Sequence, residues 1–207
     1  MKDIATLLPT VGILIFIGLY IYAANLYSGG SQLDSNSLGF DWMNNYWCNL
    51  MNENGMNGLE NPARPFAILA LIILCSSLAL FFLQFAKYFM EKGIWKSIIQ
   101  ILGTLSMISS VLIFTKYHDI MTTISSILGV LVVVGIIRAI YKSNLTVFKI
   151  SGMVCIILLG INNLIYYSGN YVEYLPLIQK ITFGMVLIWI VGLNLKMKNK
   201  NMLQHSV

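Results

Sequence analysis

Six long apolar stretches, separated by polar segments, constrain the fold of this chain more than any other feature. They cover residues 7–27, 65–86, 97–115, 120–141, 147–166 and 177–195. A run of about 18 or more apolar residues with few charges is long enough to cross a bilayer as an α-helix. Only 10% of the residues are charged, against about 25% in soluble domains. We therefore predict an all-α membrane protein, with residues 1–207 forming one integral membrane domain of six transmembrane helices.

The basic residues predict how these helices are oriented. If both termini are cytoplasmic, ten lysines and arginines fall on the inside and three on the outside. The inner set is Lys2, Lys87, Lys92, Lys96, Arg138, Lys142, Lys149, Lys196, Lys198 and Lys200, and the outer set is Arg64, Lys116 and Lys180. This bias follows the positive-inside rule and predicts an N-in, C-in multi-pass protein of the cell membrane, of the bacterial inner-membrane type. Because the basic residues lie between apolar stretches rather than on one polar surface, nucleic acid is excluded as a partner.

Residues 28–64 form the only long polar segment, and they connect the first two predicted spans on the outer side. This segment carries two tryptophans, Arg64 and four acidic residues: Asp34, Asp41, Glu53 and Glu60. A connection of this length between helices is usually functional or disordered, and its aromatic and turn residues argue against disorder. We expect a structured outer loop in which residues 39–65 fold as a lid over the outer helix ends and touch the turn that holds His118.

Polar residues near the outer helix ends indicate where a ligand pocket would lie. Asp119 is followed by Thr122 and Ser126 on one face of the fourth helix, and Asn163 lies near the outer end of the fifth. Polar groups at membrane depth are costly unless they face a cavity or each other. The predicted ligand-binding residues are Trp42, Asn45, Trp47, Asn49, Asn61, Arg64, His118, Asp119, Thr122, Ser126, Asn163, Tyr166 and Lys180.

Each of these residues also has a purely structural interpretation. Asp119 would cap the fourth helix by accepting backbone N–H bonds, and the small residues would let helices approach closely. Asn163 would bond to a neighbouring helix, and the tyrosines would form an interfacial belt. Lys180, about one turn inside the sixth helix, would extend its ammonium group to the interface or pair with Asp119, Glu60 or Asp41.

An enzymatic function is the alternative to binding. His118 would act as general base, oriented by Asp119 or Asp41, because imidazole exchanges protons readily near neutral pH. The sequence does not identify the nucleophile, and Cys48, Ser125 and Ser126 are candidates by residue type. We predict no metal and no cofactor, because zinc sites need three or four ligands and the chain has only two histidines.

The loop and the topology resemble the Frag/DRAM/Sfk-like six-helix membrane proteins and their bacterial relatives. In those relatives the first outer loop carries Asn-x-x-Ser-Asp-Leu-Gly, then Asn-Pro, and a histidine follows at the start of the fourth helix. The corresponding residues here are 45–51 (NYWCNLM), Asn61-Pro62 and His118. Cys48 and Asn49 replace the Ser-Asp pair, so a carboxylate is missing at that place. The resemblance implies a six-helix membrane protein associated with lipid-linked processes.

We therefore expect the protein to bind or handle a lipid or other amphiphile in a pocket under the outer loop, with membrane lipid as its partner. Trp42 and Trp47 suit the headgroup level, where amphipathic rings are stable. A membrane-embedded enzyme acting on a lipid-linked substrate is the first alternative. The second is a structural subunit of a membrane complex, packed against a partner membrane protein.

Overall fold

The computed structural model describes residues 2–90, 92–141 and 143–205, with side chains for residues 5–90, 92–141 and 143–198. Within these ranges the chain is helical, with three short 3₁₀ turns and no strand longer than a single bridge. The elements are α1 (Lys2–Leu26), η1 (Trp47–Met51), α2 (Arg64–Phe89), α3 (Ile94–Val111), η2 (Leu112–Phe114), α4 (His118–Tyr141), α5 (Thr146–Ser168), η3 (Val172–Tyr174) and α6 (Leu175–His205).

All six α-helices are long and apolar enough to cross a membrane, which confirms the all-helical prediction with six spans. The observed helices begin within a few residues of the predicted stretches. At its C-terminal end α6 continues beyond the predicted residue 195 as far as His205, because its last turns are polar but still helix-forming.

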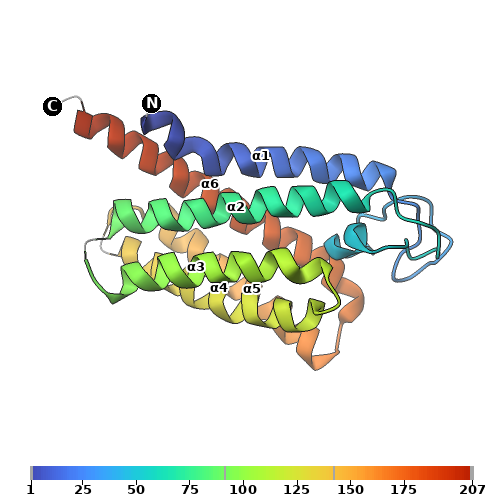
Figure 1. The fold of residues 1–207 in the computed structure, drawn as a ribbon. Coiled ribbons are helices and arrows are strands. Elements are labelled where there is room, and N and C mark those ends of the chain that lie inside the picture. The colour runs from blue at the N-terminus through green and yellow to red at the C-terminus, as the bar shows by residue number, and fades with distance from the viewer. Residues whose placement is uncertain (1, 91, 142, 206–207) are drawn as a thin grey trace.

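The helices form a closed ring in which each one packs beside its neighbour in the chain and α6 returns to α1. Figure 1 shows both termini at one end of the bundle, together with the α2–α3 and α4–α5 connections. We call this the terminal end. The α1–α2 connection, the α3–α4 turn and the α5–α6 connection lie at the other end, which we call the loop end. Short connections of this kind place successive helices antiparallel.

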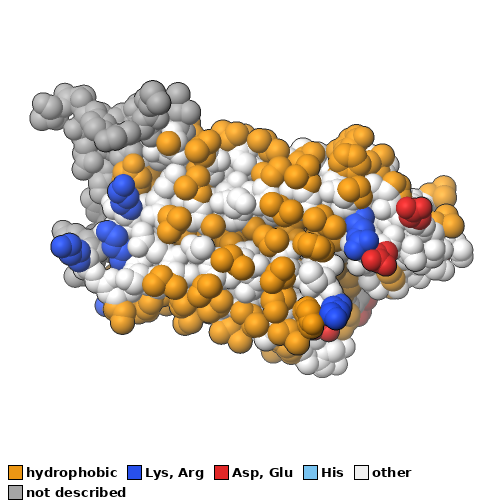
Figure 2. Space-filling model, viewed as in Figure 1, with side chains coloured by type: hydrophobic (Ala, Val, Ile, Leu, Met, Phe, Trp, Pro, Cys, Tyr) orange, Lys and Arg blue, Asp and Glu red, His pale blue; other side chains and the backbone are white. Residues whose placement is uncertain are grey.

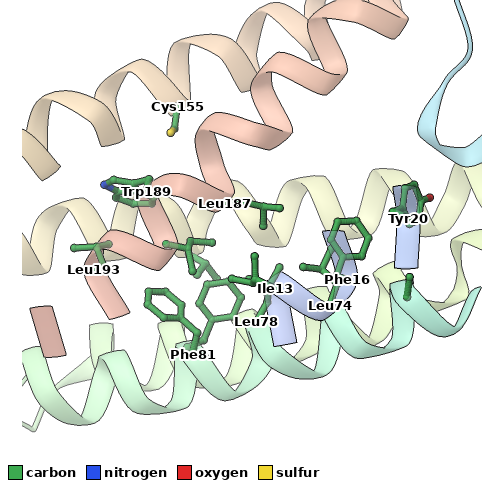
Figure 3. Packing of buried hydrophobic residues seen from close by; sticks show 14 of the residues in the cluster. Ile13, Phe16, Tyr20, Leu74, Leu78, Phe81, Cys155, Leu187, Trp189 and Leu193 are labelled. Carbon is green, nitrogen blue, oxygen red and sulfur yellow. The ribbon is translucent and has the colours of Figure 1, made fainter. Parts of the chain in front are cut away.

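Most of the buried apolar side chains belong to α1, α2 and α6. Figure 3 shows Phe16 of α1, Leu74 and Phe81 of α2, and Leu187 of α6 pointing toward one another, and each is more than nine-tenths buried. A buried amide ties two of these helices together, because Asn194 Oδ1 accepts from Thr10 Oγ1 at 2.7 Å and Asn194 Nδ2 donates to the Thr6 carbonyl at 2.9 Å. Both polar ends of the amide are satisfied, as burial requires.

The outer surface carries a band of apolar side chains with charges at both ends. In Figure 2 basic side chains gather at the terminal end, and acidic ones lie at the loop end. In α3, α4 and α5 only 17% of the most apolar window is buried, against 39% in α1 and 44% in α2. These three helices therefore present most of their apolar side chains outward, which is compatible with a multi-pass membrane protein.

Candidate functional site

Residues 27–63, which we call the lid, connect α1 to α2 at the loop end through a set of tight turns. Gly30 N donates to the Ser37 carbonyl at 2.8 Å, and Asn57 N donates to the Gly29 carbonyl at 3.2 Å. Gly29 and Gly30 have φ values of +122° and +79°, in the region that favours glycine. The glycine pair therefore lets the chain reverse immediately after α1.

Two buried asparagines hold the backbone of the lid. Asn45 Oδ1 accepts from Asp41 N at 2.8 Å, and Asn45 Nδ2 donates to the Gly30 carbonyl at 2.9 Å. Asn61 Nδ2 donates to the carbonyls of Leu50 and Asn52, at 3.1 and 2.9 Å, and Asn61 Oδ1 accepts from Ala63 N. Their amide groups are thus occupied by the lid itself, and the structure gives them a structural role in place of the predicted ligand contacts.

Asp41 closes a turn of the lid and does not approach His118. Its Oδ1 accepts from the N–H groups of Met43 and Asn44, and its Oδ2 accepts from Asn44 Nδ2 at 2.8 Å. Burial acts to raise the pKa of the Asp41 carboxyl, but these hydrogen bonds and the nearby Lys180 charge outweigh it and lower the pKa below its usual range. Asp41 is therefore a charged turn cap and not the orienting partner of the histidine.

Aromatic side chains fill the space between the lid and the helices. The ring centroid of Trp47 lies 4.7 Å from that of Tyr20 on α1 and 6.0 Å from that of Phe183 on α6. Trp42 lies 6.0 Å from Trp47, and Tyr20 Oη donates to the Trp47 carbonyl at 3.0 Å. The Asn49 Oδ1 and Trp47 Nε1 atoms are buried here without a hydrogen-bond partner among the described residues. The lid is thus seated on a packed aromatic cluster.

Lys180 of α6 attaches the lid to that helix. Its Nζ donates to the carbonyl of Asn45 and, at 2.9 Å, to that of Pro176, and it lies 5.7 Å from the centroid of the Phe40 ring. Within the described residues it forms no ion pair with Asp119, Glu60 or Asp41. Arg64 instead pairs with Glu53 at 3.1 Å. Both predicted basic ligand contacts are therefore directed at the lid.

A second polar group lies at the loop end of α4 and α5. His118 Nδ1 is 3.0 Å from Asp119 Oδ1, and Tyr166 Oη donates to the same carboxylate at 3.4 Å. Thr123 Oγ1 donates to the Asp119 carbonyl at 2.8 Å and lies 3.1 Å from Tyr167 Oη. We call these five residues the His118 cluster.

A groove of about 480 Å³ runs between α4 and α5 beside the His118 cluster. Its lining residues are Thr123, Ser126, Ile127, Val130, Val133, Ile156, Leu159, Gly160, Asn163 and Tyr167. Since α4 begins at the loop end and α5 ends there, the four hydroxyl and amide side chains of the lining lie toward the loop end. The remainder of the lining is apolar. From Thr123 to Val133 the groove extends about 15 Å, from the 1.5 Å rise per helical residue.

Some of the predicted polar residues on α4 and α5 line the groove, and others face elsewhere. Ser126 and Asn163 line the groove, and Asn163 Nδ2 donates to the Leu159 carbonyl at 2.8 Å. Asn162 bonds instead to Thr182 on α6. Thr122 is outside the groove lining, and its hydroxyl is buried with no hydrogen-bond partner among the described residues.

Of the ten lining residues the sequence predicted only Ser126 and Asn163, and Thr123, Gly160 and Tyr167 are among the eight that it missed. The available signal was helical spacing, because Thr123 is four residues after Asp119 and so shares a face with it as closely as Thr122 does. A count from Asp119 alone does not decide which of the two threonines faces α5.

No hydrogen bond, ion pair or ring contact among the described residues makes the predicted contact between the lid and the turn that holds His118. In the described part of the chain, the hydrogen bonds, ion pairs and ring contacts of the lid go to α1, α2 and α6. Tyr46 and Cys48 of the lid interact electrostatically with Tyr166 of α5, and this is how the lid comes near the His118 cluster. The physical reason for the missing contact is that α6 and α1 lie side by side in the ring and the lid packs on them. The predicted residues therefore form two groups, the lid with Lys180 and the His118 cluster with its groove.

The His118 cluster contains a base and a carboxylate that orients it, but the described residues supply no nucleophile. No thiol or hydroxyl lies within hydrogen-bond distance of the His118 ring. Cys48 is in the lid, where burial raises the pKa of its thiol to about 11. Ser125 Oγ donates to the Thr122 carbonyl at 3.0 Å.

We predict that Cys48 is slow to react with thiol reagents at neutral pH. The thiolate is the reactive form, and with a pKa of about 11 only about one thiol in several thousand is ionised at pH 7.4. Alkylation by iodoacetamide should therefore be roughly 300-fold slower than that of a free cysteine with an ordinary pKa of about 8.5, and it should accelerate as the pH rises from 8 to 10. Mass spectrometry of the lid peptide measures the rate, with denatured protein as the control. A rate at pH 7.4 equal to that of denatured protein would contradict the buried thiol.

Comparisons of the chain with protein-family models, curated proteins and solved structures give no match. Among the described residues, no three His, Cys, Asp or Glu side chains are grouped closely enough to hold a metal ion. The argument for function therefore depends on the geometry of the groove and the lid.

Proposed function

We propose that the protein binds a membrane lipid or another amphiphile in the groove between α4 and α5. The observation that carries the proposal is the distribution of polarity along the groove. Thr123, Ser126, Asn163 and Tyr167 lie toward the loop end, and aliphatic side chains line the rest. A mainly apolar cavity with a few polar groups at one end is the usual design for a ligand with a polar head and an apolar chain.

The His118 cluster supplies the contacts for the polar head. Tyr167 lines the groove and lies 3.1 Å from Thr123 Oγ1, so the cluster is continuous with the groove. The Asp119 side chain is largely exposed, and that of His118 is partly so. In this proposal the head is recognised by hydrogen bonds to the tyrosine hydroxyls, the imidazole and the carboxylate, while the lid has a structural role.

The proposal includes an N-in, C-in topology in the cell membrane, with the loop end outside. It is supported by the ten basic residues against three that this orientation places inside, and by the short connections at the terminal end that carry them. The groove then opens into the outer leaflet. The resemblance to the Frag/DRAM/Sfk-like proteins agrees with a lipid ligand.

Substitution of Gly160 tests the groove directly. An added Cβ at Gly160 meets no atom within 4 Å, so the backbone accepts a side chain, and Gly160→Leu adds an apolar side chain at a residue that lines the groove. We expect native mass spectrometry of the full chain in a neutral detergent to show one saturable adduct with dioleoylphosphatidylethanolamine. Gly160→Leu should weaken this binding by at least tenfold.

Gly18→Leu is the matched control. Gly18 is an exposed glycine in the middle of α1, and its Cβ would also meet nothing within 4 Å. Gly18→Leu makes the same chemical change in a helix far from the groove, so the affinity of this variant for the phospholipid should equal that of the wild type. Unchanged affinity in Gly160→Leu, or an equal loss in both variants, would overturn the proposed site.

One observation favours a second function, hydrolysis of a bound lipid by water. Because Asp119 holds Nδ1 of His118 at 3.0 Å, Nε2 is left to accept a proton from water. Release of a soluble headgroup or a free fatty acid from the same lipid by the wild type, and its loss in His118→Ala at lipid concentrations that saturate the variant, would support catalysis. Binding without any product would leave the first proposal alone.

A further inference from the structure

A second cavity lies at the terminal end, away from the groove and the lid. It has a volume of about 690 Å³ and lies between the α2–α3 connection, the start of α3 and the last turns of α4. The lining is Phe89, Met90, Lys92, Gly93, Ile94, Trp95, Val134, Ile137, Arg138, Ala139 and Tyr141. We call this the basic cavity.

Among the described residues, no acidic side chain pairs with the cationic groups of the basic cavity. Arg138 lies with its guanidinium carbon 5.3 Å from the centroid of the Trp95 ring. Within the described residues, neither Lys92 nor Arg138 forms a hydrogen bond or an ion pair through its side chain. The Trp95 ring thus fixes one face of the guanidinium and leaves its N–H donors available.

The electrostatic surroundings add to this positive charge. Lys149 lies 5.7 Å from the centroid of the Tyr141 ring at the edge of the cavity, and Lys96 Nζ donates to the Met90 carbonyl. The acidic side chains that the structure describes are all at the loop end, at Asp34, Asp41, Glu53, Glu60, Asp119 and Glu173. Glu91 follows Met90 in the sequence but lies outside the described residues.

The rest of the lining is apolar, which matches one kind of anion. Val134, Ile137, Arg138 and Tyr141 follow the helical spacing of i, i+3, i+4 and i+7, so they share one face of α4. The arginine and the tyrosine lie toward the helix end, and the aliphatic residues continue along α4 toward the exposed apolar surface of the bundle. A soluble anion would use only the charges, whereas a lipid would use both parts.

We infer that the basic cavity binds the headgroup of an anionic phospholipid, with Arg138 and Lys92 contacting the phosphate and the acyl chains running along α3 and α4. Basic pockets between transmembrane helices on the cytoplasmic side are a known form of anionic lipid site. This site is separate from the groove between α4 and α5, and the inference does not depend on that groove binding a ligand.

Comparison of two lipids and three variants tests the inference. In native mass spectrometry of the full chain, dioleoylphosphatidylglycerol should bind at least tenfold more tightly than dioleoylphosphatidylcholine. Each basic contact near a lipid headgroup changes affinity by about fivefold, so the double variant Lys92→Gln, Arg138→Gln should lose about 25-fold for the anionic lipid. Lys196→Gln removes an exposed charge near the same end of the bundle but outside the cavity, and it should leave this affinity unchanged.

Three results would overturn the inference. They are equal affinity for both lipids, an equal loss in Lys196→Gln, and competition by glycerol 1-phosphate at concentrations similar to those of the phospholipid. The last result would make this a site for a soluble anion. Gly160→Leu should retain the preference for the anionic lipid, which separates this site from the groove.

A second measurement keeps Lys92 and Arg138 intact, so it tests the site even if the double variant does not fold. Tryptophan fluorescence should be quenched more by brominated phosphatidylglycerol than by brominated phosphatidylcholine in nanodiscs. The extra quenching should be absent in Trp95→Phe, because Trp95 lines the cavity. Equal quenching by the two lipids would also reject the site.

Discussion

Gly30→Ala should destabilise the protein by about 2–5 kcal/mol and displace the lid. A Cβ at Gly30 would lie 2.3 Å from the Asn57 nitrogen and 2.5 Å from the Met56 carbonyl carbon, both of which are backbone atoms. The φ of +79° adds about 1–2 kcal/mol of strain for a residue with a Cβ, and overpacking adds about 1–3 kcal/mol. Thermal unfolding in detergent measures the loss of stability, and chymotryptic cleavage at the lid aromatics should become at least tenfold faster.

Gly58→Ala separates the backbone strain from the clash. Gly58 is in the same lid with a φ of +81°, but its Cβ would meet nothing within 4 Å. This variant should lose only the strain of about 1–2 kcal/mol and keep the proteolytic resistance of the wild-type lid. Equal losses in both variants would mean that the packing of residues 56 and 57 on Gly30 is unimportant.

Phe81→Ala should cost about 3–5 kcal/mol, the range for removing a buried aromatic side chain. Phe81 is fully buried in α2, with its ring centroid 5.6 Å from those of both Phe82 and Phe85. Figure 3 shows it facing the core that α1, α2 and α6 share. The change leaves a cavity that the surrounding helices fill only in part. Unfolding by sodium dodecyl sulfate in mixed micelles measures the difference in free energy.

Leu83→Ala is the control for Phe81. Leu83 lies two residues further along α2, on the outer face, with 42% of its surface exposed. Its truncation should change the free energy of unfolding by no more than about 0.5 kcal/mol, as at other surface positions. A loss as large as that of Phe81→Ala would show that α2 packs in a different orientation.

The helices were predictable because a physical length sets them. A bilayer core of about 30 Å requires about 20 apolar residues in a helix, and this requirement marks each span in the sequence regardless of its neighbours. The extension of α6 to His205 lay outside the prediction, because apolar length does not indicate where a polar helix stops.

The arrangement of the site was less predictable because it depends on which helices are neighbours. The polar residues of the lid were interpreted as ligand contacts, but Asn45 and Asn61 satisfy lid backbone groups instead. An asparagine in a loop looks the same in the sequence whether its amide binds a ligand or hydrogen-bonds to the backbone. Likewise the sequence places Thr122 and Thr123 next to one another, and only the packing of α5 against α4 selects Thr123 for the groove.

Because the lid is attached to α6, it can reach its final packing only after α6 has been synthesised. The carbonyl of Asn45 accepts from Lys180, 135 residues later in the chain, and Trp47 packs on Phe183. At a translation rate of about 5–20 residues per second, the lid segment waits roughly 7–27 s for the helix that secures it. During that interval Trp47 has its contacts with Tyr20 of α1 but lacks Phe183, so a chain truncated before α6 lacks both the lysine and the aromatic contact that attach the lid to that helix.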